Sequence, residues 1–155
     1  MSKTNAIRIL DSNNIKYETI SYEVDENDLS GETVANKVGV DPDMVFKTLV
    51  CVGDKTSNIV FCIPVTTELN LKKAAQVSNN KKVEMIPLKD LLPLTGYIRG
   101  GCSPVGMKKQ FPTYVDETAQ LYENIFISAG IRGTQMKLKP NDLLKLVNGN
   151  YAELI

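Results

Sequence analysis

The sequence predicts an α+β fold: a single domain with a mixed, largely antiparallel sheet or open barrel and helices around it. Segments with strand-like patterns cluster through the middle of the chain, and helical patterns occur at irregular intervals. No repeat or low-complexity linker divides the 155 residues. A chain of this length is long enough for one buried core and short for two. We therefore expect residues 1–155 to form one domain.

The elements before residue 45 follow from helical spacing and from signals at helix ends. Ser30 is favourable at a helix N-cap, and Gly39 can adopt the left-handed conformation that ends a helix. Asp41 is a favourable N-cap for a short turn, and Pro42 after it fits the first helical position. The predicted elements are a helix over residues 4–13, a strand over 17–22, a solvated acidic loop over 23–28, a helix between Ser30 and Gly39, and a turn from Asp41.

The clearest signal in the middle of the chain is a β-hairpin. Residues 45–52 and 58–65 are strand-like, and a short segment that begins with Gly53 joins them. Asn70 can cap the next helix, and Pro140 suits the first turn of the last helix, which we expect Gly149 to end. The other predicted elements are a helix over 71–77, a strand over 82–86, a helical turn over 88–92, strands over 113–116, 124–128 and 134–138, and an edge strand over 151–155.

Composition excludes several kinds of chemistry. The chain has no histidine, so it cannot form a Ser-His-Asp triad, a Cys-His pair or an H-E-x-x-H zinc site. Cys51, Cys62 and Cys102 show no C-x-x-C spacing, so we expect no disulfide, no metal site and no cofactor. The 18 basic and 18 acidic residues argue against strong nonspecific binding to nucleic acid. Because no apolar stretch is as long as a signal sequence or a membrane span, we expect a cytoplasmic protein.

Lys47 is the best candidate for a functional cation. Alternation along strand 45–52 places it on the same face as Val45, Leu49 and Cys51. An ammonium on such a face must be paired, reach water or meet a ligand anion. A lysine that extends to solvent from a sheet edge explains the pattern equally well, so the pattern alone leaves both interpretations open.

A glycine-rich segment over residues 97–106 is a second candidate. Gly100, Gly101 and Gly106, together with Ser103 and Pro104, force a tight backbone whose N–H groups can converge on an anion or a polarised carbonyl, as in an oxyanion hole. A plain turn between strands is the alternative. The cysteine of this loop has no imidazole or metal to activate it as a nucleophile.

The third candidate is the turn over residues 127–133, where a strand stops at Ser128. Its hydroxyl and the guanidinium of Arg132 would then lie at the end of a sheet, where the arginine could hold a phosphate or carboxylate. A solvated arginine in a glycine turn is the alternative.

Taken together, these segments resemble the YbaK/EbsC family of aminoacyl-tRNA deacylases, which is related to the editing domain of bacterial prolyl-tRNA synthetases. The resemblance spans essentially the whole chain in order, so the combination is far more specific than any one motif. The matching segments are Tyr22, residues 43–49, residues 71–74, residues 95–97 with 100–106, and residues 128–133.

The resemblance implies a free-standing editing enzyme that removes cysteine from misacylated tRNA(Pro), and also from Cys-tRNA(Cys), and so serves translation fidelity. It implies that Lys47, Gly101 and Tyr22 are catalytic, with Lys47 contacting the terminal adenosine or phosphate. It implies that the glycine loop surrounds the ester carbonyl and the amino-acid side chain. The implied substrate-binding residues are Thr48, Gly100, Cys102, Ser103, Pro104, Ser128, Gly130, Arg132 and Gln135.

This activity is compatible with the absence of histidine. Cysteine is close in size to proline, so a synthetase pocket rejects it weakly, and editing after transfer is then useful. A cysteinyl ester carries its own nucleophile, because its thiol can attack its own carbonyl and release a thiolactone. The enzyme then needs only to hold the attack geometry and stabilise the oxyanion.

The chain departs from the family at Ile131 and Gln135, where many relatives have a basic residue and an aspartate. Gln135 can form hydrogen bonds but cannot act as a base, so rate or amino-acid selectivity can differ. We expect the partner to be the tRNA acceptor end, with prolyl-tRNA synthetase or competition from an elongation factor supplying tRNA specificity. A non-catalytic module that binds a nucleotide or small anion is the rival hypothesis. The lysines available for tRNA are Lys72, Lys73, Lys81, Lys82, Lys108, Lys109, Lys137 and Lys139.

Overall fold

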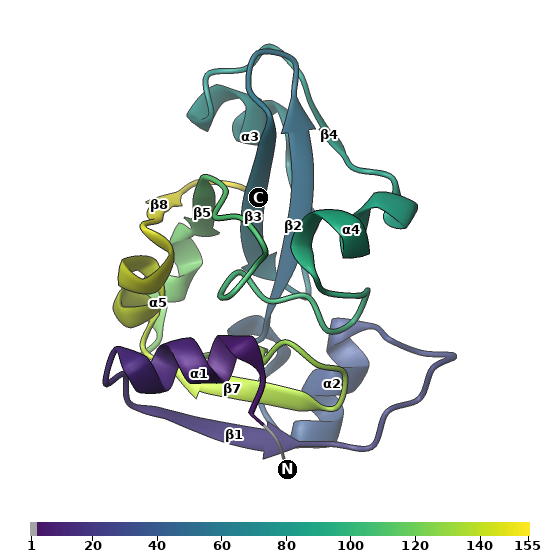
Figure 1. Ribbon diagram of the computed structural model, residues 1–155, viewed down its shortest axis with the longest axis vertical. Coiled ribbons are helices and arrows are strands. Elements are labelled where there is room, and N and C mark those ends of the chain that lie inside the picture. Colours follow the sequence, from purple (N-terminus) through teal and green to yellow (C-terminus); the bar gives the residue numbers. More distant parts are fainter. Residues whose placement is uncertain (1–2) are drawn as a thin grey trace.

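Figure 1 shows the computed structural model, which describes residues 3–155. Its strands are β1 (Tyr17–Ser21), β2 (Phe46–Gly53), β3 (Asn58–Pro64), β4 (Val83–Met85), β5 (Thr113–Asp116), β6 (Ile125–Ser128), β7 (Thr134–Leu138) and β8 (Asn150–Ala152). Its helices are α1 (Asn5–Ser12), α2 (Gly31–Val38), α3 (Leu71–Val77), α4 (Leu91–Thr95) and α5 (Pro140–Val147). Three 3₁₀ turns complete the elements: η1 (Pro42–Met44), η2 (Leu88–Asp90) and η3 (Glu117–Leu121).

The strands form two sheets. One has the order β1-β7-β6 and is antiparallel throughout. The other has the order β4-β2-β3-β5-β8, with antiparallel pairing around the β2–β3 hairpin and parallel pairing of β5 with β3 and β8. A parallel bridge between Val45 and Phe126 connects the two sheets. The predicted α+β class is therefore confirmed, with the strands divided between two sheets.

The predicted helix ends are mostly confirmed. The side chains of Ser30, Asp41 and Asn70 each accept a hydrogen bond from a backbone N–H of the helix or turn that follows. Gly39 ends α2 with φ of 73°, in the left-handed region. At the end of α5 the prediction is wrong by one residue, because Asn148, with φ of 51°, adopts the left-handed conformation that we expected of Gly149.

Two other predicted boundaries differ from the structure. The turn predicted over residues 88–92 is longer, because η2 leads directly into α4, which ends at Thr95. The edge strand predicted over residues 151–155 is β8, which pairs only over Asn150–Ala152. Residues 153–155 leave the sheet because their backbone groups bond elsewhere: Asp116 accepts from Leu154 N, and Asn70 N donates to Leu154 O.

Hydrophobic residues pack on both faces of the larger sheet. The main core lies between that sheet, the smaller sheet, α1 and α5, and includes Phe46, Val60 and Ile127. Under α3, on the other face of the hairpin, Cys51, Phe61 and Ile63 form a second cluster. A small third cluster, which includes Val45, Val65 and Phe126, lies where the two sheets meet and packs against α2. No helix within residues 3–155 is long and apolar enough to cross a membrane.

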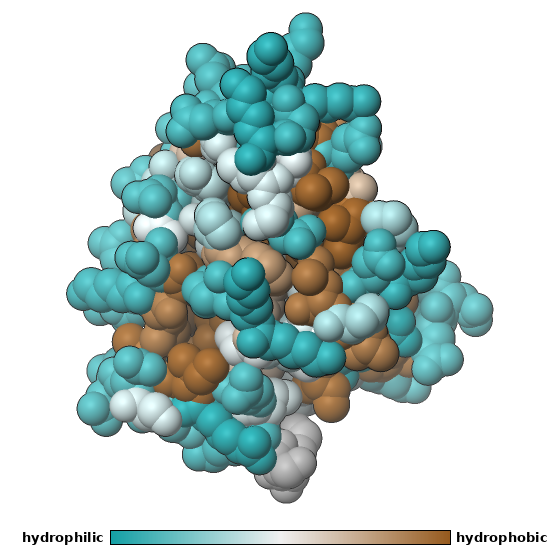
Figure 2. Space-filling view, turned by 45° about the horizontal axis from the view of Figure 1, so that its top comes forward, coloured by the Kyte–Doolittle hydropathy of each residue, from teal (hydrophilic) through white to brown (hydrophobic). Residues whose placement is uncertain are grey.

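Part of the surface is apolar. Figure 2 shows hydrophilic residues over the end of the hairpin and hydrophobic residues exposed beside it, on the side of β4 and α4. The large exposed apolar residues of this region are Val52, Met85, Leu88 and Leu92.

Candidate active site

A cleft with a volume of about 440 Å³, part of it open to solvent, lies where the two sheets meet. Its lining comes from α2 and from Leu29, two residues before that helix. It also comes from the start and the end of the hairpin, from the glycine loop, and from the facing ends of β6 and β7. The lining residues are Leu29, Gly31, Val34, Val45, Phe46, Lys47, Thr48, Val65, Gly100, Cys102, Ser128 and Gln135.

One wall of the cleft is apolar because α2 packs closely on the hairpin. Val45 and Val65 are almost fully buried there, and Val65 N donates to Val45 O at 2.8 Å. Gly31, the first residue of α2, permits this approach, since a β-carbon at this position would collide with the side chain of Val65. The wall therefore depends on a glycine at the start of the helix.

Lys47 is a half-buried ammonium in this cleft. It lies on β2 opposite Ile63 of β3. The ammonium of Lys47 forms no hydrogen bond or ion pair within residues 3–155. An ammonium on an apolar face must be paired, reach water or meet a ligand anion. Pairing within the described chain is excluded for Lys47, so its ammonium contacts water or a ligand anion.

Ser128 and Gln135 face each other as partners of the β6–β7 pair. The hydroxyl of Ser128 accepts from Gly130 N at 3.1 Å and can still donate one hydrogen bond. Gln135 is 5% exposed. Its Oε1 is the one buried side-chain oxygen or nitrogen in the described part of the chain that has no hydrogen-bond partner.

The two glycine-containing segments are in direct contact. A β-carbon on Gly101 would lie only 3.0 Å from the backbone nitrogen of Arg132. The Nε of Arg132 donates to Arg99 O at 2.7 Å, and the ring of Tyr97 packs against Gly130. The glycine-rich segment over residues 97–106 and the turn over residues 127–133 are therefore one structural unit, which closes one side of the cleft.

Six predicted site residues line the cleft, namely Lys47, Thr48, Gly100, Cys102, Ser128 and Gln135. The other six lie close by without lining it. Ser103 is fully buried, and its hydroxyl accepts from Val105 N at 3.3 Å. The backbone N–H of Tyr22 donates to the carbonyl oxygen of Gly133, in the turn over residues 127–133, at 2.9 Å. The six are Tyr22, Gly101, Ser103, Pro104, Gly130 and Arg132.

Most of the apolar lining was not predicted from the sequence. Strand alternation had placed Val45 beside Lys47, so this residue had a signal that could have been used. Leu29, Gly31 and Val34 carried no such signal, because their place at the cleft depends on how α2 packs against the hairpin, which sequence spacing does not describe.

The thiols of the chain are poor nucleophiles. Burial raises the pKa of Cys51, Cys62 and Cys102 to about 12 in each case. For Cys102 a hydrogen bond with Thr95 opposes this shift and does not overcome it. Near neutral pH Cys102 therefore gives the cleft a neutral thiol surface and no thiolate.

Because of these raised pKa values, iodoacetamide should alkylate the folded protein slowly at pH 8. A thiol with a pKa of about 12 is ionised to about one part in 10⁴ at that pH. In urea all three cysteines should react within minutes, and mass spectrometry measures both rates. Rapid modification of Cys102 in the folded protein would restore it as a candidate nucleophile.

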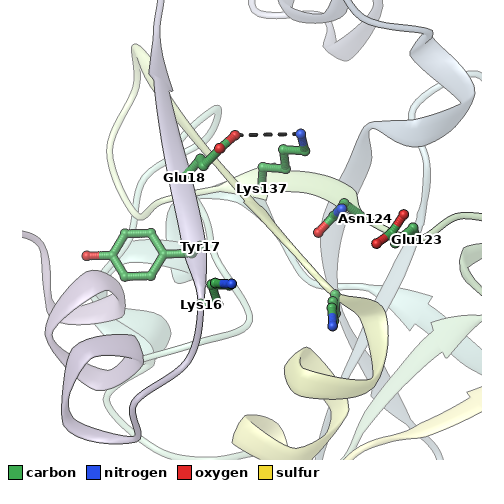
Figure 3. Close-up of a pocket in the computed structure, with 7 residues that line it drawn as sticks. Lys16, Tyr17, Glu18, Glu123, Asn124 and Lys137 are labelled. Carbon is green, nitrogen blue, oxygen red and sulfur yellow. Dashed lines mark ion pairs between the residues drawn. The ribbon is translucent and has the colours of Figure 1, made fainter.

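A larger hollow, of about 880 Å³ and also partly open to solvent, lies beside β1 and the end of β7 (Figure 3). It has mixed charge, because Glu18 and Glu123 stand beside its lysines, and Lys137 approaches Glu18 at 3.6 Å. The ring of Tyr17 points away from these charged groups, and its hydroxyl donates to Asp11 at 2.7 Å. Since its charges largely cancel, this hollow has no concentrated field for an anion.

Several lysines proposed for tRNA contacts have partners on the protein itself. Lys73 donates to Glu153 and to Ile155 O, both at 2.6 Å. Lys82 pairs with Glu84 at 2.8 Å, and Lys108 donates to Pro93 O at 3.4 Å. The ammonium in the cleft thus differs from them in having no such partner within the described chain.

The sequence of this chain is similar to those of known proteins. The model of the aminoacyl-tRNA editing domain matches residues 26–146. A protein from Enterococcus faecalis named for Cys-tRNA(Pro)/Cys-tRNA(Cys) deacylation, EbsC, is 53% identical over 98% of this chain and 93% of its own length. The uncharacterised YwhH of Bacillus subtilis is 25% identical over 72% of this chain and 71% of its own length.

The fold also matches a solved structure. A crystal structure described as that of a trans-editing enzyme for prolyl-tRNA synthetase superposes with a TM-score of 0.84, at 24% identity, over 99% of this chain and 98% of that one. The family model and the similarity to EbsC confirm the resemblance read from the sequence, and the chain belongs to the aminoacyl-tRNA editing domain family.

Proposed function

We propose that the protein removes cysteine from misacylated tRNA(Pro), and also acts on Cys-tRNA(Cys), using the cleft between the two sheets. One observation carries the proposal: a small cleft holds the ammonium of Lys47, which has no partner within residues 3–155, beside neutral groups, and none of the lining residues is a carboxylate or an imidazole. Such a site can bind and orient an activated ester but offers no strong protein base. The name of the 53% identical relative supports cysteine as the amino acid.

In this mechanism the substrate supplies the nucleophile. The sulfur of the cysteinyl group attacks its own ester carbonyl, the bond between the carbonyl carbon and the ribose oxygen breaks, and the thiol proton passes to that oxygen. The products are a thiolactone and free tRNA. Lys47 anchors the phosphate or ribose of the terminal adenosine, and the cleft keeps the thiol and the carbonyl in attack geometry.

The glycine loop has a more specific role than the sequence analysis gave it. The N–H of Gly101 already donates to Ile98 O at 3.0 Å, so it is not free for an oxyanion. We therefore assign the oxyanion contact to the N–H of Cys102, which makes no backbone hydrogen bond in the described chain. Gly101 is then a positioning residue, because its lack of a side chain lets Arg132 approach the loop.

Like Gly101, the other five predicted residues outside the lining keep supporting parts in this proposal. Tyr22, Gly130 and Arg132 hold the turn over residues 127–133, and Ser103 and Pro104 shape the glycine loop. The partner is the acceptor end of tRNA, and we propose prolyl-tRNA synthetase as the source of tRNA specificity, since the chain has no net charge. We propose a cytoplasmic location, because charged tRNA is used there.

The test compares tRNA(Pro) charged with cysteine, alanine or proline. The ester of cysteine should disappear at least ten times faster than the others, each rate divided by its uncatalysed rate, because only cysteine carries the thiol. Equal loss of the alanyl ester would contradict attack by the substrate thiol. No turnover of any ester would instead favour a non-catalytic module that binds a nucleotide or anion at Lys47.

A further inference from the structure

We infer that Gln135 selects esters with a free α-ammonium group, so that the enzyme acts on aminoacyl esters and discriminates against those whose nitrogen is acylated or absent. The inference rests on the proposed function and adds a substrate class to it. It extends to peptidyl-tRNA, whose α-nitrogen is an amide, and which the enzyme should leave intact.

The first observation is the state of the Gln135 side chain. Its Oε1 is buried and has no donor within residues 3–155, where every other buried side-chain oxygen or nitrogen has a partner. A buried carbonyl oxygen without a donor is unfavourable and rare in folded proteins. The terminal torsion of glutamine is broad, so the carboxamide can rotate to present this oxygen to a donor in the cleft.

The second observation is the position of Gln135. It lies on the face of β7 that meets the cleft, while its neighbour Met136 is fully buried in the main core. Across the sheet it is paired with Ser128, whose hydroxyl oxygen already accepts from Gly130 N. Of these two side-chain oxygens, only that of Gln135 has no donor within the described residues. A donor group of a ligand at this end of the cleft can therefore bind to it.

The third observation is the distribution of charge. Lys47 is the one charged residue among those that line the cleft. Its ammonium attracts a phosphate and repels a second cation, so a bound ester should place its α-ammonium away from it. A neutral amide oxygen can accept from that ammonium, and the lining holds no carboxylate that would compete with it. The other side-chain acceptors of the lining are the hydroxyls of Thr48 and Ser128, and that of Ser128 already accepts from Gly130 N.

The donors of the substrate narrow the choice further. The ester carbonyl and the phosphate oxygens only accept hydrogen bonds, and the thiol is a weak donor that the reaction consumes. The terminal adenosine also has neutral donors, its free ribose hydroxyl and its N6 amino group, but these are the same whichever acyl group is attached. The ammonium donates three strong hydrogen bonds, whereas thiolactone formation itself does not involve the nitrogen. The nitrogen can also change the uncatalysed rate of the reaction. Any further dependence of the enzymatic rate on the nitrogen must therefore come from its contacts with the protein.

The experiment uses tRNA(Pro) esterified with cysteine, with 3-mercaptopropionate or with N-acetylcysteine. All three carry the attacking thiol, and 3-mercaptopropionate lacks the nitrogen without adding bulk. The full chain should prefer the cysteinyl ester by about 10- to 100-fold in kcat/KM, each value divided by its uncatalysed rate, as expected for a hydrogen bond from a charged group. Gln135→Leu should reduce this preference to about one by slowing the cysteinyl ester alone.

Two further variants separate selection from a general effect on the strand. Gln135→Glu retains an acceptor and should keep the preference, and Met136→Leu, a core change on the same strand, should leave it unchanged. A preference near one in the natural protein, or one that survives in Gln135→Leu, would overturn the inference. Equal turnover of the three esters would contradict this inference and leave the proposed function in place. No turnover of any of them would contradict the proposed function as well.

Discussion

Replacing Lys47 with methionine should lower kcat/KM for Cys-tRNA(Pro) by about 100-fold, the loss expected for a charge-assisted contact worth about 3 kcal/mol. The same change should not destabilise the fold. Lys47 is half-buried and unpaired within the described residues, so its removal should leave the free energy of unfolding unchanged or raise it by up to about 1 kcal/mol. Single-turnover deacylation and urea denaturation measure the two quantities.

Lys55 provides the matched control, because it lies on the same hairpin but is exposed at its turn, away from the cleft. Lys55→Met should edit at the natural rate. Full activity of Lys47→Met would remove this ammonium from the mechanism and leave it as a lysine that extends to solvent. Lower stability would show that the cation has a structural partner after all.

The second large effect concerns stability. Asp116 is fully buried, and its carboxylate accepts from Leu154 N at 2.9 Å, from Thr118 N at 3.1 Å and from the Thr118 hydroxyl at 2.6 Å. Asp116→Ala leaves these donors unsatisfied and should cost about 3 kcal/mol of unfolding free energy. In a chain of this size the melting temperature should fall by about 6–12 °C.

The control for Asp116 is Asp90, an exposed aspartate whose side chain makes no cap hydrogen bond. Asp90→Ala should change the melting temperature by less than about 2 °C. Calorimetry of the two variants side by side checks the prediction. Similar melting temperatures for both would mean that the C-terminal segment contributes little to global stability.

The features that could be predicted from the sequence are those that local residues decide. The hairpin follows from two apolar runs and a polar turn, and the caps at Ser30 and Asn70 follow from side chains that bond to the nearest backbone. The end of α5 was missed by one position, because Asn148 and Gly149 both tolerate the left-handed conformation and the sequence does not rank them.

The cleft was predictable only in part, since it depends on packing between distant segments. Pattern and resemblance identified Lys47, Ser128 and Gln135. They could not show that the glycine loop contacts the turn at Arg132, nor that α2 forms the apolar wall through Gly31. Each of these contacts joins two segments that are separated by other strands or helices, and no local rule of spacing or capping describes them.

The bridge between Val45 and Phe126 has a consequence for when the activity arises. The cleft residues run from Leu29 to Gln135, and their contacts span most of the chain. Pairings at such long sequence separation form late, because the intervening loops must close first. A nascent or partly unfolded chain therefore has no esterolytic cleft. The enzyme should acquire its activity in the last cooperative step of folding, so refolding followed by activity and by fluorescence of a tyrosine should show the same final phase.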